Sequence, residues 1–320
     1  MTALPDTDYD IPLPDPQAAV VAVQAPGAGA GHWAGAPSAV LHDGVIWLAY
    51  RLRAPIGAGR GYAVVVARSD DGVAFETVAT IERCDMDTDS LERPALAVTP
   101  DGRWRLYLSC ATPGTLHWAV DVLEAPEPAA FDPAQRQRVL DGGPAVAYKD
   151  PVVLPGSATE PWAMWVCRHD VADSSEADAM RSCYATSRDG LHWEMGAVAL
   201  AGRPGQWDSR GARITSVTAS GERLVAYYDG RASFAENWEE RTGIAVGRFP
   251  DAFTALGDGP AASSPWGSGA LRYLSVVVVP AGGVHFYYEL SRPDGSHDLC
   301  TEYVAASSPQ AERGGALRSA

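Results

Sequence analysis

The sequence lacks the excess of basic residues that binding to nucleic acid or to an anionic membrane surface requires. Its 320 residues include 25 Lys and Arg against 40 Asp and Glu, which gives a formal net charge of −15 and a pI near 4.8. No Lys/Arg-rich block interrupts this acidic composition. Because an acidic chain repels phosphate groups, nucleic-acid binding and attachment to anionic lipid are excluded as functions.

Long apolar runs are also absent, and the first residues of the sequence show none of the features of a targeting leader. No window reaches 18 uninterrupted apolar residues, and the start MTALPDTDYDIPLPDP has no basic segment, apolar core or small-residue cleavage site. We therefore expect a soluble, cytoplasmic protein with no membrane span. The oligomeric state stays open.

Cysteine and metal motifs are sparse. The five cysteines (Cys84, Cys110, Cys167, Cys183 and Cys300) are odd in number and form no C-x-x-C pair, so we expect reduced, partly buried thiols. None of the seven His belongs to an H-E-x-x-H motif, and no G-x-S-x-G marks a serine nucleophile. The sequence therefore predicts neither a metal site nor a cofactor.

Turn-forming residues, by contrast, are plentiful: 32 Gly and 24 Pro punctuate a sequence that repeats. An apolar strand, a polar turn and a strand ending on an aromatic residue recur at 36–51, 93–109, 150–166, 212–228 and 274–289. The starts lie 57, 57, 62 and 62 residues apart, which is room for about four strands. This pattern predicts an all-β, five-bladed β-propeller with almost no helix.

One propeller domain is expected to use the whole chain, residues 1–320. Blades are expected to begin near residues 32, 89, 148, 207 and 271, after an N-terminal extension over 1–17. The last copy has only three strands, so the apolar run at 18–25 is expected to close its blade and protect the sheet edges. Residues 306–320 are expected to form a flexible tail.

Chemistry is expected where the blades open, because the first strand of each blade lines the propeller axis. Facing carboxylates surrounded by Arg, Tyr and Trp suit glycoside chemistry, in which one acid protonates the leaving oxygen and a second carboxylate activates water. We predict Glu92, Asp150 and Asp208 as the catalytic carboxylates. The predicted substrate-binding residues are His32, Trp33, Arg51, Arg93, Lys149, His169, Arg210, Arg213, Asp229, Tyr273 and Glu289.

Two further features bear on this pocket. The loop FAENWEER at 234–241 could overhang it, with Glu236, Trp238 and Glu239 facing a ligand or simply solvent. The charged residues at the axis could also serve only as ion pairs that hold the blades together, because structural networks produce the same clusters.

The ordered motifs resemble the five-bladed propellers of glycoside hydrolase family 130, which comprises mannoside phosphorylases and mannosidases, and more distantly those of families 43 and 32. The motifs are PSAVLHDGVIWLAYR and ARSDDGVAF in blade one, LERPAL in blade two, YKDPVVLP in blade three, WDSRGARI in blade four and VVVP with FYY in the last. They span roughly residues 32–304. The resemblance implies a propeller fold and action on a small glycoside.

Departures from the family pattern keep the reaction open. Arg93 stands where the resemblance implies the catalytic Asp, Asp229 where it implies a phosphate-binding His, and Ala36 where families 43 and 32 have a blade-one Asp. An Arg cannot donate a proton near neutral pH, and a carboxylate repels phosphate. We therefore expect a glycoside hydrolase; the alternatives are a repurposed or non-catalytic propeller that binds a sugar or sugar-derived metabolite, and a mannoside phosphorylase.

Overall fold

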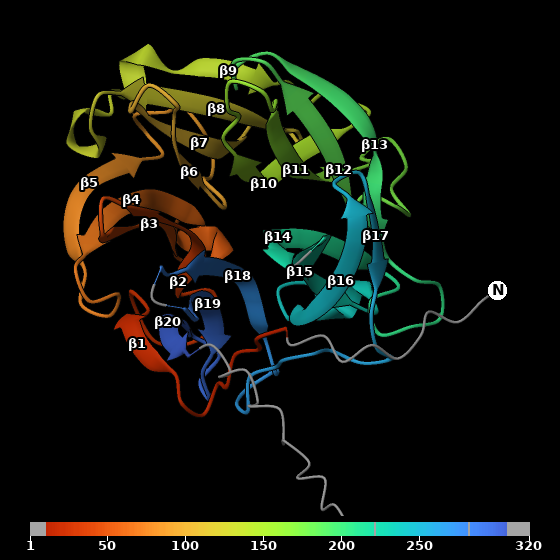
Figure 1. The fold of residues 1–320 in the computed structure, drawn as a ribbon. Helices are drawn as coiled ribbons and strands as arrows, with labels where there is room; N and C mark the ends of the chain where they lie inside the picture. The colour runs from red at the N-terminus through yellow and green to blue at the C-terminus, as the bar shows by residue number, and fades with distance from the viewer. Residues whose placement is uncertain (1–10, 221, 281, 306–320) are drawn as a thin grey trace, which may run out of the picture.

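The computed structural model describes residues 11–220, 222–280 and 282–305, and these residues form an all-β protein (Figure 1). The tail expected over 306–320 and the first ten residues of the expected N-terminal extension lie outside the described residues. Helical structure in the described ranges consists of the 3-10 turns η1 (Ile56–Ala58), η2 (Pro128–Ala130), η3 (Pro133–Gln135) and η4 (Phe234–Glu236). None of these turns has the length or apolar character needed to cross a membrane. The predicted all-β class is confirmed.

The strands pair in antiparallel groups of four. The first group comprises β2 (Trp33–His42), β3 (Val45–Arg53), β4 (Gly61–Ser69) and β5 (Glu76–Glu82). The second comprises β6 (Ala95–Val98), β7 (Trp104–Ala111), β8 (Trp118–Ala125) and β9 (Gln137–Leu140). The third comprises β10 (Ala147–Leu154), β11 (Trp162–His169), β12 (Met180–Ser187) and β13 (Trp193–Ala201). The fourth comprises β14 (Gly211–Ser220), β15 (Arg223–Arg231), β16 (Arg241–Phe249) and β17 (Ala252–Ala255).

The last group joins the two ends of the chain. It contains β18 (Leu271–Val278), β19 (Val284–Ser291), β20 (His297–Val304) and, beside β20, β1 (Val20–Val23). Val20 lies opposite Thr301 and Val21 opposite Cys300 in the antiparallel β1–β20 pair. A strand from the N-terminal region thus covers the β20 edge, which would otherwise offer unpaired backbone groups to another chain.

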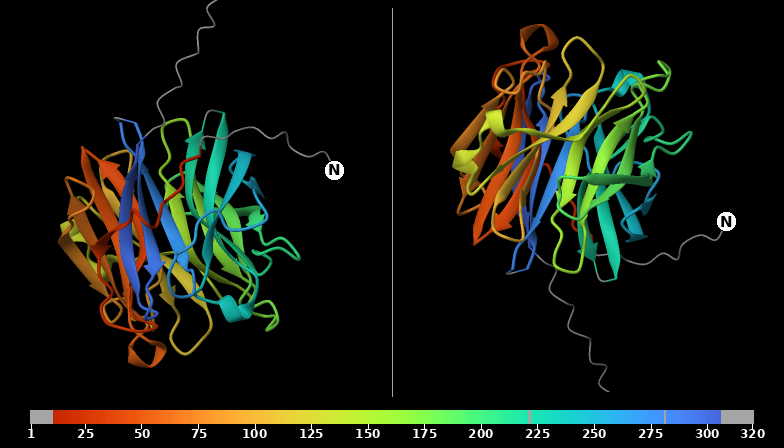
Figure 2. Two further views of the ribbon diagram at one scale, coloured as in Figure 1. Left: turned by 90° about the horizontal axis from the view of Figure 1, so that it is seen from below. Right: turned by 90° about the horizontal axis from the view of Figure 1, so that it is seen from above.

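The groups stand around a common centre, and their first strands face it (Figure 1). These inner strands touch in a cycle: β2 contacts β6, β6 contacts β10, β10 contacts β14, β14 contacts β18, and β18 contacts β2. Hydrogen-bonded pairing does not follow the whole cycle, because the described strands form three separate sheets. In the side views of Figure 2 the strands run between two opposite faces, so the connecting loops gather at those faces.

Hydrophobic cores lie between neighbouring groups, one at each junction. The core between the first two groups, for example, combines Val64 and Val66 of β4 with Leu106 and Leu108 of β7. Corresponding clusters join the second to the third group, the third to the fourth, the fourth to the last and the last to the first. Each group is therefore covered on both faces, which explains why its middle strands, such as β3 and β7, are buried over most of their length.

The segments 69–72 and 187–190, which both read Ser-x-Asp-Gly, form equivalent hairpin turns. Asp71 Oδ1 accepts hydrogen bonds from the backbone amides of Val73 and Ala74 at 2.8 and 2.9 Å, and Gly72 adopts a left-handed φ of 75°. Asp189 makes the same contacts with Leu191 and His192. Both aspartates therefore close turns on the outside of their groups.

Candidate functional site

A cavity opens at the centre of the molecule, at the end where the inner strands begin. Its outer part has a volume of about 340 Å³, and a narrower inner part of about 30 Å³ lies beside it. The residues that line both parts are Arg53, Glu92, Lys149, His169, Arg231, Asn237 and Trp238. Because these residues are shared, we describe both parts as one site, the axial cavity.

Breaks in strand register occur at equivalent points of three inner strands, close to this cavity. The pairing of β2 with β3 shifts after Gly35, that of β10 with β11 after Lys149, and that of β18 with β19 after Arg272. The next residue in each case, Ala36, Asp150 or Tyr273, has a left-handed φ of 52°, 56° or 57°. Non-glycine residues rarely adopt this conformation, so the strain is concentrated at equivalent points around the axis.

Arg51 joins two carboxylates across the first, second and last groups. Its Nη1 pairs with Oε2 of Glu92, and its Nη2 lies 3.0 Å from Oε2 of Glu289. Arg272 approaches the other Glu289 oxygen at 2.7 Å, and His297 Nδ1 also lies 2.7 Å from it. Glu289 is fully buried, and its negative charge is compensated by the guanidinium groups of Arg51 and Arg272.

Arg213 joins the third, fourth and last groups in the same way. Its Nη1 lies 2.9 Å from Asp150 Oδ2 and also donates to the phenol oxygen of Tyr273 at 2.9 Å. Its Nη2 lies 2.6 Å from Asp229 Oδ2. The backbone amide of Tyr273 donates to Asp229 as well, so the buried carboxylates beneath the cavity are all hydrogen-bonded.

Glu240 adds a carboxylate from the loop that follows η4. It is 2% exposed, lines the inner part of the cavity and accepts a hydrogen bond of 2.8 Å from Arg272 Nη1. The loop between η4 and β16 also places Asn237 and Trp238 on the cavity wall. The structure thus brings a loop far along the chain against the start of β18 and the end of β3.

The carboxylates that line the inner cavity are held ionised. Burial favours the neutral acid, but Arg51, Lys149 and Arg53 outweigh it and lower the pKa of Glu92 to about 2. In the same way, Arg272, Arg213 and Arg231 outweigh burial and lower the pKa of Glu240 to about 2. Both groups can accept a proton or stabilise positive charge, but neither holds a proton to donate near neutral pH.

Asp229 behaves differently. Burial, together with the nearby Glu240, raises its pKa to about 6 against the opposing effect of Arg213. Its carboxylate lies behind Arg213 and does not line the cavity. His169, which does line it, has its pKa lowered well below the ordinary value by burial and by Lys149 and Arg213, so its imidazole is neutral.

Two buried arginines of the cavity, Arg53 and Arg231, have guanidinium groups that the carboxylates around them do not fully engage. Arg53 is 3% exposed, and the contacts of its guanidinium within the described residues are with aromatic rings. It lies 4.1 Å from the ring centre of Trp33 and 5.2 Å from that of Trp238. Arg231 donates through Nη2 to Asp178 and its Nη1 lies 3.9 Å from Glu240 Oε1, whereas its buried Nε has no hydrogen-bond partner within the described chain.

The structure brings half of the predicted site residues together at the cavity. Those that line it are Trp33, Arg51, Glu92, Lys149, His169, Arg213 and Tyr273. Asp150, Asp229 and Glu289 lie behind them and hold the arginines in place. The interpretation as a structural network therefore applies to Asp150, Asp229 and Glu289, whereas the residues that line the cavity are the candidates for contact with a ligand.

The remaining predicted residues do not line the axial cavity. Asp208 is fully buried, where it accepts hydrogen bonds from Tyr228 at 2.8 Å and Arg203 at 2.9 Å. Arg210 pairs with Asp178 and Glu176 outside the cavity wall. His32 lies near Gly27, and Arg93 is directed to the opposite end of the axis.

Arg53, Arg231, Glu240 and Arg272 were not among the predicted site residues. Arg53 had a usable signal, because it follows Arg51 by two positions on one strand and therefore shares its face. The signal for Glu240 was weaker. It follows Glu239 in the loop at 234–241 that was predicted to overhang the pocket, and only the folded structure shows which of the two lines the cavity.

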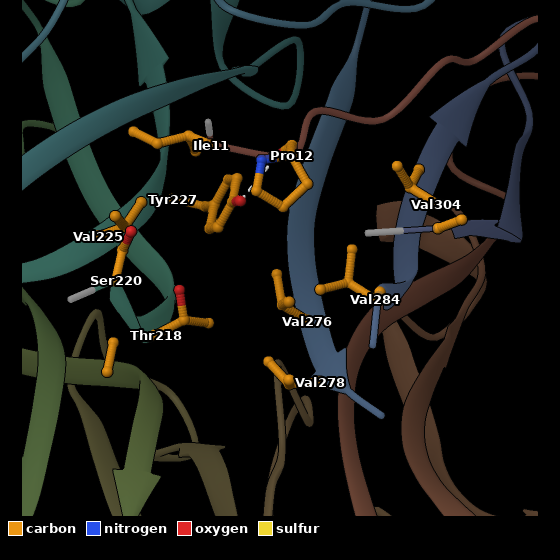
Figure 3. A pocket seen from close by; sticks show the side chains of 13 residues that line it. Ile11, Pro12, Thr218, Ser220, Val225, Tyr227, Val276, Val278, Val284 and Val304 are labelled. Atoms are coloured by element: carbon orange, nitrogen blue, oxygen red, sulfur yellow. Dashed lines mark hydrogen bonds between the residues drawn. The ribbon is translucent and has the colours of Figure 1, made fainter. Parts of the chain in front are cut away.

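Further cavities lie outside this site, and two of them are lined by residues of the inner strands. At the opposite end of the axis, a cavity of about 290 Å³ is lined mainly by aliphatic residues of the inner strands. Figure 3 shows a third cavity, of about 320 Å³, between β14–β15 and β18–β19. Tyr227 donates to the carbonyl oxygen of Pro12 there at 2.7 Å, and the described residues that line it are uncharged. Neither cavity combines the acids and bases found in the axial cavity.

No protein-family profile and no curated protein matches the chain in sequence. Solved structures match its fold. A thermostable family-43 glycoside hydrolase aligns with a TM-score of 0.67 at 14% identity, over 90% of this chain and 94% of the other. A structure from the GH130 family of mannoside phosphorylases, described as containing hydrolases of β-1,2 mannosidic linkages in Candida mannan, aligns with a TM-score of 0.59 at 17% identity over 95% of both chains.

A β-1,2-mannobiose phosphorylase from Listeria innocua aligns with a TM-score of 0.59 at 14% identity, over 86% of this chain and 90% of the other. Identities this low establish the fold and leave the reaction to be argued from the site. The resemblance predicted from the sequence motifs is confirmed at that level: the chain has the all-β, propeller-like fold of family 43 and family 130 glycoside hydrolases and phosphorylases.

Proposed function

We propose that the protein is a five-bladed β-propeller enzyme that hydrolyses a small glycoside in its axial cavity. The blade number is supported by the cyclic contacts of the five inner strands and by the core at each junction between groups. The function is supported above all by one observation: ionised Glu92 faces a cavity of about 340 Å³ that also contains tryptophan rings and hydrogen-bond donors.

Glu92 acts as the base that activates water for attack on the anomeric carbon. Its lowered pKa keeps it ionised, and its contact with Arg51 fixes the position of one carboxylate oxygen. Glu240, ionised on the same cavity, stabilises the positive charge that develops on the sugar ring. Glu92 thus keeps the role expected from the sequence, whereas Asp208 is not assigned a step because it lies outside the cavity.

Lys149 protonates the departing oxygen. Its ammonium group lines both parts of the cavity, lies over the Trp118 ring at 5.2 Å and is 3.8 Å from Asp150 Oδ2. Since the cavity-lining carboxylates Glu92 and Glu240 are ionised, a lysine ammonium is the available acid for an alkoxide leaving group. Asp150 supports this arrangement electrostatically and does not itself touch the substrate.

A sugar-binding protein without hydrolytic activity is the second candidate. It is favoured by the ion pairs that already engage Glu92 with Arg51 and Glu240 with Arg272. Carboxylates committed in this way can hold sugar hydroxyl groups without moving a proton. Both candidates bind a sugar, so measuring turnover, and not binding, distinguishes them.

The test is a panel of aryl α- and β-glycosides and mannobioses, incubated with and without inorganic phosphate while sugar release is followed. We expect phosphate-independent hydrolysis that Glu92→Gln reduces by about 100-fold or more and Lys149→Met by about ten-fold or more. Glu194→Gln, an exposed substitution outside the cavity, serves as the matched control. Release of a sugar 1-phosphate only with phosphate would identify a phosphorylase, and binding without turnover would identify the second candidate.

A further inference from the structure

The axial cavity has more cationic than anionic groups, although the chain as a whole is acidic. The carboxylates on its wall are Glu92, Asp178 and Glu240. Each is already paired with arginine: Glu92 with Arg51, Asp178 with Arg210 and Arg231, and Glu240 with Arg272 and, at 3.9 to 4.0 Å, with Arg231 and Arg213. Buried charges are normally compensated, so the cations left over in this wall need an explanation.

Three cationic side chains are left over. Within the described ranges Arg53 forms no ion pair and its guanidinium contacts aromatic rings, and the buried Nε of Arg60 has no hydrogen-bond partner. Lys149 is 3.8 Å from Asp150 Oδ2, which Arg213 already occupies at 2.9 Å. These three side chains all line the outer part of the cavity, together with Arg231, whose buried Nε has no hydrogen-bond partner in the described chain.

Arg53 is held in place before any ligand arrives. Its guanidinium contacts both the Trp33 and the Trp238 ring, whose centres lie 6.0 Å apart, and these aromatic contacts restrict its orientation. Burial and the neighbouring cations Arg51 and Arg272 lower the pKa of Arg53 to about 10, and Glu92 opposes them only partly. A bound anion would relieve this crowding of like charges, and an oriented guanidinium suits the two oxygens of a carboxylate.

The mouth of the same cavity is apolar. Ile56, Leu116, Phe234 and Trp238 all line its outer part, and their exposed fractions are 61%, 73%, 68% and 40%. They come from the segments around η1, between β7 and β8, and around η4, so the chain brings distant loops together to form this rim. Apolar side chains gathered at the entrance of a polar cavity indicate a ligand with an apolar outer end.

We propose that the axial cavity binds a glycoside whose sugar carries a carboxylate, with Arg53, Lys149 and Arg231 around the carboxylate and the apolar rim against the aglycone. This inference rests on the proposed function, because it names the substrate class of the same site. It also removes a difficulty of that function: a cation-rich wall opposes the positive charge that develops during glycoside cleavage, and a carboxylate on the sugar offsets that opposition.

Calorimetric titration of the full chain tests the proposal without requiring turnover. The probes are the methyl glycosides of D-glucuronic, D-galacturonic and D-mannuronic acid as both anomers, the matching neutral hexosides and inorganic phosphate. We expect at least one uronide to bind about ten-fold or more tightly than its neutral counterpart. Arg53→Gln should abolish this preference, Arg53→Lys should retain part of it, and Arg188→Gln, an exposed arginine outside the cavity, should leave it unchanged.

Equal binding of the uronides and hexosides overturns the proposal, and so does binding of phosphate, or of no probe at all, in place of the uronides. The comparison made with the unsubstituted protein keeps the test valid if an Arg53 variant fails to fold. Hydrolysis of neutral glycosides without a uronide preference refutes this inference and leaves the proposed hydrolase intact. A uronide that is bound tightly but not cleaved supports this inference and refutes the proposed hydrolase.

The rim has its own test. Phenyl uronides should bind about three- to ten-fold more tightly than the methyl uronides, because the phenyl group covers apolar surface at the mouth. Phe234→Ser should remove this gain and leave binding of the methyl uronides unchanged. Equal affinities of phenyl and methyl uronides for the unsubstituted protein would contradict the assignment of the rim to the aglycone.

Discussion

The guanidinium of Arg93 donates through Nη2 to the carbonyl oxygen of Thr215 at 2.7 Å, although 122 residues separate the two in the chain. Its Nε and Nη1 reach the carbonyl oxygens of Pro37 at 3.1 Å and Pro151 at 2.8 Å. Arg93 precedes β6, and its acceptors belong to β2, β10 and β14. One side chain therefore ties four inner strands together across the axis.

Replacing this arginine should destabilise the fold. Arg93→Met leaves three buried carbonyl groups without a donor, so we expect the free energy of unfolding to fall by about 3 kcal/mol or more. Urea unfolding followed by tryptophan fluorescence measures the change. Arg188→Met, at an exposed position, is the control. An Arg93 variant as stable as the control would show that these contacts do not hold the ring together.

Gly35 is a second position at which the ring tolerates little change. A Cβ on Gly35 would overlap the carboxylate and stem of Glu289, which is fixed by Arg51, Arg272 and His297. We expect Gly35→Ala to lower the thermal unfolding midpoint by about 5 °C or more. At Gly143 a Cβ would meet no atom within 4 Å, so Gly143→Ala should have little effect. Similar midpoints for both variants would be the contrary result.

The contribution of Asp229 to the free energy of unfolding should increase as the pH falls, whereas most carboxylates contribute less at low pH. Its pKa is raised on folding from 3.8 to about 6, so the folded state binds this proton more tightly than the unfolded state. As the pH falls from 7 to 4, the wild-type protein gains stability from this group, whereas Asp229→Asn cannot. The difference in unfolding free energy, wild type minus variant, should therefore rise by about 2 kcal/mol between pH 7 and pH 4. A difference independent of pH would contradict the raised pKa.

Glu92 leads to a prediction about activity. A base with a pKa of about 2 stays ionised throughout the mildly acidic range. For the glycoside that the panel identifies, kcat/KM should therefore stay within about two-fold from pH 7 to pH 4, after correction for the folded fraction. The measurement is the pH profile of initial rates. A decline with its midpoint near pH 4.5, the ordinary value for a glutamate, would mean that Arg51 and its neighbours do not control Glu92 in this way.

The repeat in the sequence predicted where the inner strands begin, and so it located Glu92, Lys149, Arg213 and Tyr273 at one end of the axis. It could not predict side-chain direction there. The register breaks and left-handed residues at Asp150 and Tyr273 interrupt the simple alternation of a strand, and consecutive residues such as Glu92 and Arg93 are directed to opposite ends of the axis. Proximity to a strand start was likewise insufficient for Asp208, which pairs with Arg203 and Tyr228.

Glu240 illustrates a different limit. It lies before β16, outside the first two strands of its group, and no periodic pattern distinguishes it from Glu236 or Glu239. Its position depends on how the whole loop after η4 folds back over the cavity. Long-range placement of a loop is a property of the assembled ring, so the sequence alone carried only a general indication of it.

The contrast between the acidic chain and its cationic cavity has a kinetic consequence. With a net charge of −15, the molecule repels an approaching anion until the ligand comes close enough for the cavity wall to dominate. Salt screens the long-range repulsion over about 8 Å at 0.15 M, but it screens contacts inside a buried site much less. Moderate salt should therefore raise the association rate constant of an anionic ligand more than its dissociation rate constant. The cavity should then fill faster at moderate ionic strength than in dilute buffer.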